Sequence, residues 1–330
     1  MSRLLTTVSA ITVIAGTYVN ADVPKVIADI APIHSLVSRV MDGVGEPKLI
    51  VPNETSPHDY RLRPADAQAI EDANLVFWMG EGLTPWMERA LEALNSDTDI
   101  VEFLALEEST RLSFREGALF EAHGDHDDHD DHDDHDDHDK DHDDHDDHDD
   151  HDDHAGHDHG EFDPHAWLST SNAKTWVNVI AAKLSSIDPN NAGTYFANAS
   201  EARNEMDALD DEINAMLAPV RGGKFIVFHD AYQYFESVYD FPASGAISLG
   251  DASDPSAARI AEIADRIKSE NIDCVLSEPQ FNAGLVKTVM GGTDANTQVI
   301  DPLGFGIEPG SSLYPKLIRA MAQSLVDCLK

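Results

Sequence analysis

The chain has 330 residues, enough to bury one large core or two ordinary ones. Its formal net charge is −40, and its hydrophobic content of 42% is normal for a soluble protein. Such an acidic chain is unsuited to nucleic acid or to an anionic membrane surface, and it is well suited to cations. We therefore expect no nucleic-acid partner.

The N-terminus is typical of a secretory signal peptide. Arg3 supplies the positive charge, an apolar stretch covers 4–19, and Val19-Asn20-Ala21 provides small residues for cleavage. The alternative is an uncleaved membrane anchor, although the segment is short and only mildly apolar for a bilayer span. No other stretch is apolar enough to cross a bilayer. We predict that 1–21 is removed and that the mature chain is exported.

Apolar runs alternate with helical patterns before the middle of the chain. The predicted strands cover 25–30, 48–51, 75–79 and 100–104, and helices begin near 33, 64 and 85. Strands that are separated by helices predict a parallel sheet.

The second half begins with two helices and then returns to alternation. The predicted helices cover 172–186 and 192–217, and the second is long for a globular protein. Further strands are predicted over 224–228, 273–277 and 298–300, with helices over 231–238, 256–270 and 312–329. The pattern predicts an α/β fold with two lobes and a long connecting helix. We place these parts at 22–188, 189–218 and 219–330.

A low-complexity tract over 123–159 contains 13 of the 17 histidines, together with 20 Asp and one Lys. It has almost nothing apolar to bury and a dense like charge, which predicts disorder. Neighbouring histidines three residues apart in an extended chain cannot share one zinc ion unless the chain bends. We therefore expect many weak metal sites that capture, buffer or sense zinc. The alternative is a loop that only increases solubility.

Three of the other four histidines lie in similar surroundings. His58 and His165 each follow a proline, and His229 ends an apolar strand. Neutral imidazole is a common zinc ligand, and ligands in open parallel sheets collect beyond the carboxyl ends of the strands. We predict that the three rings share one zinc ion in the cleft between the lobes. His34, at the end of the first strand, is a much weaker candidate.

Nearby carboxylates suggest how the site is completed. Each predicted ligand has an aspartate within two residues, and these aspartates could orient the rings. They are Asp59, Asp163 and Asp230. Three imidazoles leave one tetrahedral position, for which Asp301 is the best protein candidate, with water and Glu54 as alternatives. Three nitrogens favour zinc over manganese or calcium.

The chain has two cysteines, Cys274 and Cys328. An even pair in an exported protein favours a disulfide, which would join the last helix to a core strand. Two separate buried thiols are the alternative.

These motifs closely resemble the periplasmic high-affinity zinc-binding proteins of bacterial ABC importers, a class of metal-specific solute-binding proteins. The resemblance covers essentially the whole mature chain, and a His/Asp-rich insertion before the second histidine motif is also typical. The matching segments are Ser56-Pro57-His58-Asp59-Tyr60 with Leu62-Arg63-Pro64, Asp163 to Leu168, Phe228-His229-Asp230-Ala231-Tyr232, Ser277-Glu278-Pro279-Gln280-Phe281 and Asp301-Pro302-Leu303-Gly304.

The resemblance implies two lobes, each with a mostly parallel four-stranded sheet and flanking helices, joined by a long rigid helix. It implies zinc as the transported ligand, His58, His165 and His229 as its ligands, and a fourth ligand that varies within the family. Manganese-binding relatives usually carry Glu in place of His229. The family's pair of cysteines corresponds to Cys274 and Cys328.

The resemblance also implies where the protein acts and with what. It implies a periplasmic monomer that is not an enzyme and that delivers zinc to a membrane permease with its cytoplasmic ATPase. A periplasmic zinc chaperone is a further candidate partner. Two other functions fit the residues alone. A secreted zinc hydrolase could use three histidines and a water, but no protease signature is present. A metal buffer or adhesin-like surface protein would bind zinc mainly through 123–159.

Overall fold

The computed structural model describes residues 23–93, 98–115, 120, 162–248, 250, 255–281 and 283–330. The predicted signal peptide and the His/Asp-rich tract lie outside these residues. None of the helices in the described ranges has the length and apolar character needed to span a bilayer.

The first lobe contains a four-stranded parallel sheet with the order β2-β1-β3-β4. Its strands are β1 (Val26–Ala28), β2 (Lys48–Leu49), β3 (Leu75–Trp78) and β4 (Asp99–Glu102). Its helices are α1 (Ala31–Val40), α2 (Pro64–Glu71), α3 (Pro85–Glu92) and α4 (Thr170–Ile187). The two central strands, β1 and β3, are buried along their whole length, as expected for parallel strands with both faces covered.

The second lobe repeats this arrangement with the order β6-β5-β7-β8, again parallel throughout. Its strands are β5 (Phe225–His229), β6 (Ala246–Ser248), β7 (Cys274–Ser277) and β8 (Asn296–Val299). Its helices are α6 (Gln233–Tyr239), α7 (Ala257–Ser269), α8 (Ala283–Val289) and α9 (Leu313–Leu329). The expected two-sheet α/β fold is therefore confirmed, although β6 and α8 had not been predicted.

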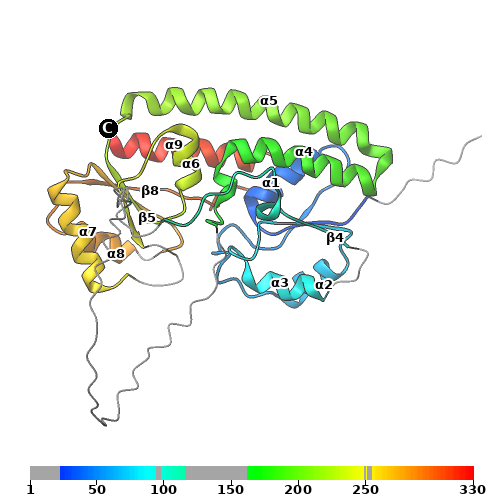
Figure 1. The fold of residues 1–330 in the computed structure, drawn as a ribbon, viewed down its shortest axis with the longest axis horizontal. Coiled ribbons are helices and arrows are strands. Elements are labelled where there is room, and N and C mark those ends of the chain that lie inside the picture. Colours follow the sequence, from blue (N-terminus) through cyan, green and yellow to red (C-terminus); the bar gives the residue numbers. More distant parts are fainter. Residues whose placement is uncertain are drawn as a thin grey trace, which may run out of the picture.

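Helix α5 (Ala192–Leu217) runs along both lobes and packs on α4 and α9, which lie beneath it (Figure 1). Helices α2 and α3 lie on the far side of the first sheet, and α7 and α8 lie on the far side of the second. Buried side chains from both lobes and from α5 belong to one continuous apolar cluster. The lobes therefore share a core, and the long helix is part of it.

The alternation of side chains along β5 sets the direction of its last residue. Phe225 and Val227 pack in the shared cluster, whereas Ile226 and Phe228 pack in a second cluster with α7 and α8. Because successive side chains of a strand point to opposite faces, His229 belongs to the face of Phe225 and Val227. The strand thus turns His229 away from α7 and α8.

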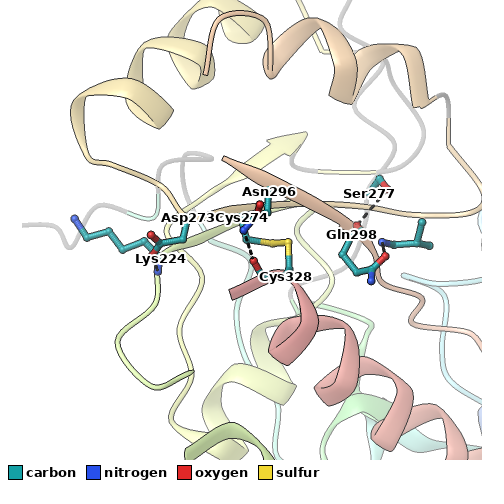
Figure 2. Close-up of a disulfide and its surroundings, with 8 residues drawn as sticks. Lys224, Asp273, Cys274, Ser277, Asn296, Gln298 and Cys328 are labelled. Carbon is teal, nitrogen blue, oxygen red and sulfur yellow. Dashed lines mark hydrogen bonds between the residues drawn. A yellow bond between two sulfur atoms is a disulfide. The ribbon is translucent and has the colours of Figure 1, made fainter. Parts of the chain in front are cut away.

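Cys274 and Cys328 form a disulfide, with their Cα atoms 5.7 Å apart (Figure 2). The bond joins the first residue of β7 to the end of α9. Beside it, the Asn296 side chain donates a hydrogen bond of 3.0 Å to the carbonyl of Cys328. The disulfide lies at the amino ends of the strands, the edge opposite to that of His229.

Candidate metal centre

His165 is held by a carboxylate two residues before it. The Asp163 side chain accepts hydrogen bonds from the backbone N–H of His165 (2.9 Å) and from its Nδ1 (2.7 Å), and both residues are buried. A carboxylate only accepts hydrogen bonds, so the proton must lie on Nδ1. The Nε2 atom is then the free donor for a metal ion. The predicted role of Asp163 in orienting this ring is confirmed.

His229 is held in the same way by a residue from a neighbouring strand. Its Nδ1 lies 2.7 Å from a carboxylate oxygen of Glu278, which directly follows β7. Since β5 and β7 are adjacent and parallel, their carboxyl ends meet at the same edge of the sheet. Both side chains are buried, so Glu278 orients the His229 ring with Nε2 as the nitrogen that could bind a metal ion.

The two Nε2 nitrogens face each other across the lobes. Nε2 of His165 and Nε2 of His229 are 3.4 Å apart. Two nitrogens that bind one tetrahedral zinc ion at about 2.0–2.1 Å are themselves about 3.3–3.4 Å apart. The observed spacing is therefore the spacing that a shared zinc ion requires.

His58 lies at the same place, on the loop that follows β2. Its ring centroid is 5.7 Å from that of His165. The carbonyl of the preceding Pro57 accepts a hydrogen bond of 2.9 Å from the Trp86 indole, which ties this loop to α3. The three predicted histidines are therefore brought together from three distant parts of the chain.

The three rings surround a small cavity of about 20 Å³, enough for one water-sized group. Its lining residues are Ser56, Pro57, His58, His165, Trp167, His229, Glu278, Gln280, Phe281, Pro302 and Leu303. Over the described ranges, no three His, Cys, Asp or Glu side chains have their donor atoms placed for one metal ion. Two histidines thus have the spacing of a shared zinc ion, and His58 would have to move to join them as a third ligand.

The other candidates lie apart from this cavity. His34 is on α1, where its Nε2 lies 3.1 Å from the carbonyl of Pro47. Glu54 lines a different, more open pocket with Arg63. Asp301 follows β8 and accepts hydrogen bonds from Leu303 N–H (3.0 Å) and from the Gln280 amide (3.3 Å), but it does not line the cavity. Burial raises the pKa of Asp301, and the charge of nearby Glu278 raises it further.

The expected role of Asp230 in orienting His229 is wrong. Asp230 forms an ion pair with Arg115, and Glu278 holds the ring instead. The strand ends at His229, and the Asp230 side chain directly after it is directed to Arg115 instead of to the His229 ring. Asp59 is exposed, and a role for it in orienting His58 stays a prediction.

Sequence reasoning also gave no role to Glu278, Gln280 or Trp167. Glu278 carried one usable signal, because it is an acidic residue directly after a buried strand. The Trp167 ring lies 5.2 Å from that of His165, and its indole donates a hydrogen bond of 2.8 Å to the carbonyl of Pro302 in the other lobe. It therefore closes one wall of the cavity.

Two α/β lobes with a shared core, and buried imidazoles facing each other between them, define a solute-binding protein for a metal ion. The chain belongs to the ZnuA family, described as zinc-uptake complex component A, periplasmic, whose family model matches residues 26–328.

Known relatives agree in sequence and in fold. The high-affinity zinc uptake system protein ZnuA of Brucella abortus is 48% identical over 314 residues, which cover 95% of this chain and 94% of the relative. A crystal structure of ZnuA is 23% identical, with a TM-score of 0.71 over 94% of this chain and 100% of that one. A ZnuA deletion mutant with zinc bound gives a TM-score of 0.70 at 23% identity, over 94% and 99% of the two chains.

Proposed function

We propose that this protein is the periplasmic zinc-binding component of an ABC-type zinc uptake system. It captures Zn²⁺ between its lobes and passes the ion to the membrane permease, which works with a cytoplasmic ATPase. The observation that carries this proposal is the 3.4 Å between the Nε2 atoms of His165 and His229. Zinc is the transported ligand, and the protein is not an enzyme.

His58, His165 and His229 serve as the zinc ligands in this proposal. Asp163 and Glu278 support it, because each holds one ring with its Nε2 available. Asp301 is the proposed fourth ligand and would have to leave its contacts with Gln280 and Leu303. Closure of the loop that carries His58 would bring the third imidazole to the ion.

The size of the cavity separates a binding protein from a hydrolase. A cavity of about 20 Å³ takes an ion, whereas sites for small-molecule substrates are about 300–1,000 Å³. The cavity is therefore much closer in size to an ion than to a peptide or an ester.

The proposed organisation follows from this function. Residues 1–21 are a signal peptide that is removed on export, 22–188 and 219–330 form the lobes, and 189–218 connect them. The tract over 123–159 binds zinc ions weakly at many points and passes them to the tight site between the lobes. The mature protein acts as a monomer, and a periplasmic chaperone is a candidate zinc donor.

Tryptophan fluorescence can report the tight site separately from the tract. All four tryptophans lie outside 123–159, at 78, 86, 167 and 176. Trp167 lines the cavity, and Trp86 holds the loop of His58. Zinc in the cavity should therefore change the emission, whereas zinc in the tract should have little effect.

The test is a zinc titration with a competing chelator, followed by this fluorescence. Replacing His58, His165 or His229 by Ala should weaken tight binding about 100-fold or more, since each variant loses a nitrogen ligand. His34→Ala is the matched control and should bind like the wild type. Unchanged tight binding in all three ligand variants would refute the proposed site.

Deletion of 123–159 separates the uptake protein from a simple metal buffer. The uptake function predicts that the deletion removes weak sites and leaves one tight site, as counted by calorimetry. Loss of the tight site with the tract would favour the buffer.

A further inference from the structure

Arg115 forms an ion-pair network with two buried carboxylates of the second lobe. Its guanidinium donates hydrogen bonds to Asp230, including two of 3.0 Å from Nε, and to Glu236 at 2.8 and 3.1 Å. Asp230 directly follows β5, and Glu236 lies in α6. Arg115 itself comes from the segment that follows β4 of the first lobe. The network therefore joins the two lobes.

All three side chains are largely withdrawn from water. The exposed fraction is 17% for the Arg115 side chain and 6% for each carboxylate side chain. Burial raises the pKa of Asp230 and of Glu236, while Arg115 lowers both. Removing one partner from a buried network leaves uncompensated charge, which is strongly unfavourable. Loss of Arg115 should therefore displace the carboxylates or draw water to them.

A second set of contacts fixes the same segment beside Arg115. The Tyr234 hydroxyl of α6 accepts a hydrogen bond of 3.0 Å from Leu112 N–H and donates one of 2.8 Å to the carbonyl of Asp163. Ser113 and Phe162 form an antiparallel bridge, and Asp163 N–H donates a hydrogen bond of 2.8 Å to the Leu112 carbonyl. The segments around Leu112 and Asp163 are thus joined to each other and to α6.

These contacts reach both histidines of the central pair. Asp230 follows His229 in the chain, so its ion pair holds the backbone at the end of β5. Asp163, fixed through Leu112 and Tyr234, accepts the Nδ1 proton of His165. Arg115 and Tyr234 thus form one clamp. The clamp fixes the residues that hold the His165 and His229 rings, which belong to different lobes.

We propose that Arg115 is a positioning residue of the zinc site, which sets the relative placement of His165 and His229 by clamping the segment before the His/Asp-rich tract onto the second lobe. This inference rests on the proposed zinc site. Arg115 touches neither ring and acts through Asp230 and the bridged segments around Leu112 and Asp163.

The expected effect is a loss of zinc affinity. Residues that support metal ligands from outside typically change affinity 10–100-fold when they are replaced. Arg115→Ala should weaken tight binding by about that factor. Arg115→Lys should weaken zinc binding less, by about 3–10-fold. The lysine ammonium keeps the positive charge, but it lacks the planar guanidinium that binds two carboxylates at once.

Arg39→Ala is the matched control. The Arg39 side chain is 15% exposed and also binds two carboxylates, Glu201 and Glu205, at 2.8–3.1 Å. That network joins α1 to α5, away from the cavity. A general structural effect of losing a semi-buried arginine should appear in both alanine variants, whereas a positioning effect should appear only in Arg115→Ala.

The experiment titrates the full chain with zinc against a chelator, using tryptophan fluorescence, and also measures the rise in Tm that saturating zinc causes. We expect Arg39→Ala to bind zinc like the wild type. Arg115→Ala should bind zinc 10–100-fold more weakly, and saturating zinc should raise its Tm by less. Equal affinities of Arg115→Ala and Arg39→Ala would overturn the inference. If Arg115→Ala does not fold, Arg115→Lys decides, and wild-type affinity in that variant would also overturn it.

His229→Ala, in the same series, separates failure of this inference from failure of the proposed function. If His229→Ala keeps tight binding, the zinc site itself is wrong. If His229→Ala loses tight binding while Arg115→Ala keeps it, the site stands and only the positioning role fails.

Discussion

Nε2 of His165 and Nε2 of His229 lie 3.4 Å apart, although 63 residues separate them in the chain and they belong to different lobes. Each ring is oriented by a carboxylate on its Nδ1, one local in sequence and one from a neighbouring strand. At this spacing one metal ion could bind both Nε2 atoms. The arrangement therefore favours a bound metal ion.

The carboxylate behind His229 should matter for affinity even though it is not a proposed ligand. Glu278→Gln keeps an acceptor near Nδ1 but removes the charge that makes the ring a stronger donor, and we expect about tenfold weaker zinc binding. Glu278→Ala should lose more. Competition titration measures both. Glu262→Gln, an exposed residue on α7, is the control, and equal affinities in all variants would contradict the role of Glu278.

Asp301 tests how the coordination is completed. It lies outside the cavity and already accepts hydrogen bonds from Gln280 and Leu303, so its entry as a ligand needs a rearrangement. We expect Asp301→Asn to weaken zinc binding about tenfold, less than any of the three histidine variants, as measured by the same titration. Wild-type affinity in Asp301→Asn would assign the fourth position to water or to another group.

Asp29 should make stability depend on pH. It is fully buried at the end of β1, accepts hydrogen bonds from Ile30 and Met79 N–H, and burial raises its pKa to about 7 from an ordinary value of 3.8. Between these values the folded state holds the proton and the unfolded state does not. The contribution of Asp29 to the free energy of unfolding is therefore highest below about pH 4, and it falls as pH rises towards 7.

The expected slope from Asp29 is at most about 1.4 kcal/mol per pH unit. Urea unfolding of the wild type and of Asp29→Asn at several pH values between 4 and 8 measures it. The difference in unfolding free energy between the two proteins should change in favour of the variant as pH rises. A difference that is independent of pH would show that Asp29 titrates normally.

The disulfide should affect stability without affecting zinc. Replacing Cys274 and Cys328 by Ser opens a loop of 54 residues in sequence and should lower the free energy of unfolding by about 3–4 kcal/mol. The bond lies at the opposite edge of the sheet from Glu278, so zinc affinity should stay within about twofold. Urea unfolding and zinc titration of the same samples test this. A large loss of affinity in folded protein would mean that the two edges are coupled.

Most elements could be predicted from the sequence because their causes are local. The apolar runs of β1, β3 and β5 and the long helix α5 were expected at nearly their observed positions. β6 and α8 were missed because their short sequences, Ala-Ile-Ser and one with Gly at its second position, lack the apolar run or helical pattern that marks the equally short β1 and α6. Their places are determined by packing against β5 and β7.

The sequence by itself determined the chemistry of this protein: an exported acidic chain, three histidines in distinct motifs, two cysteines and a repeated α/β pattern. These follow from residue types and short spacings. Only the tertiary structure decided which side chains meet. Glu278 holds His229 because β7 lies beside β5, and Asp230 meets Arg115 because the end of β5 lies beside the segment that follows β4. Contacts between distant segments depend on strand order and side-chain direction, which no local spacing encodes.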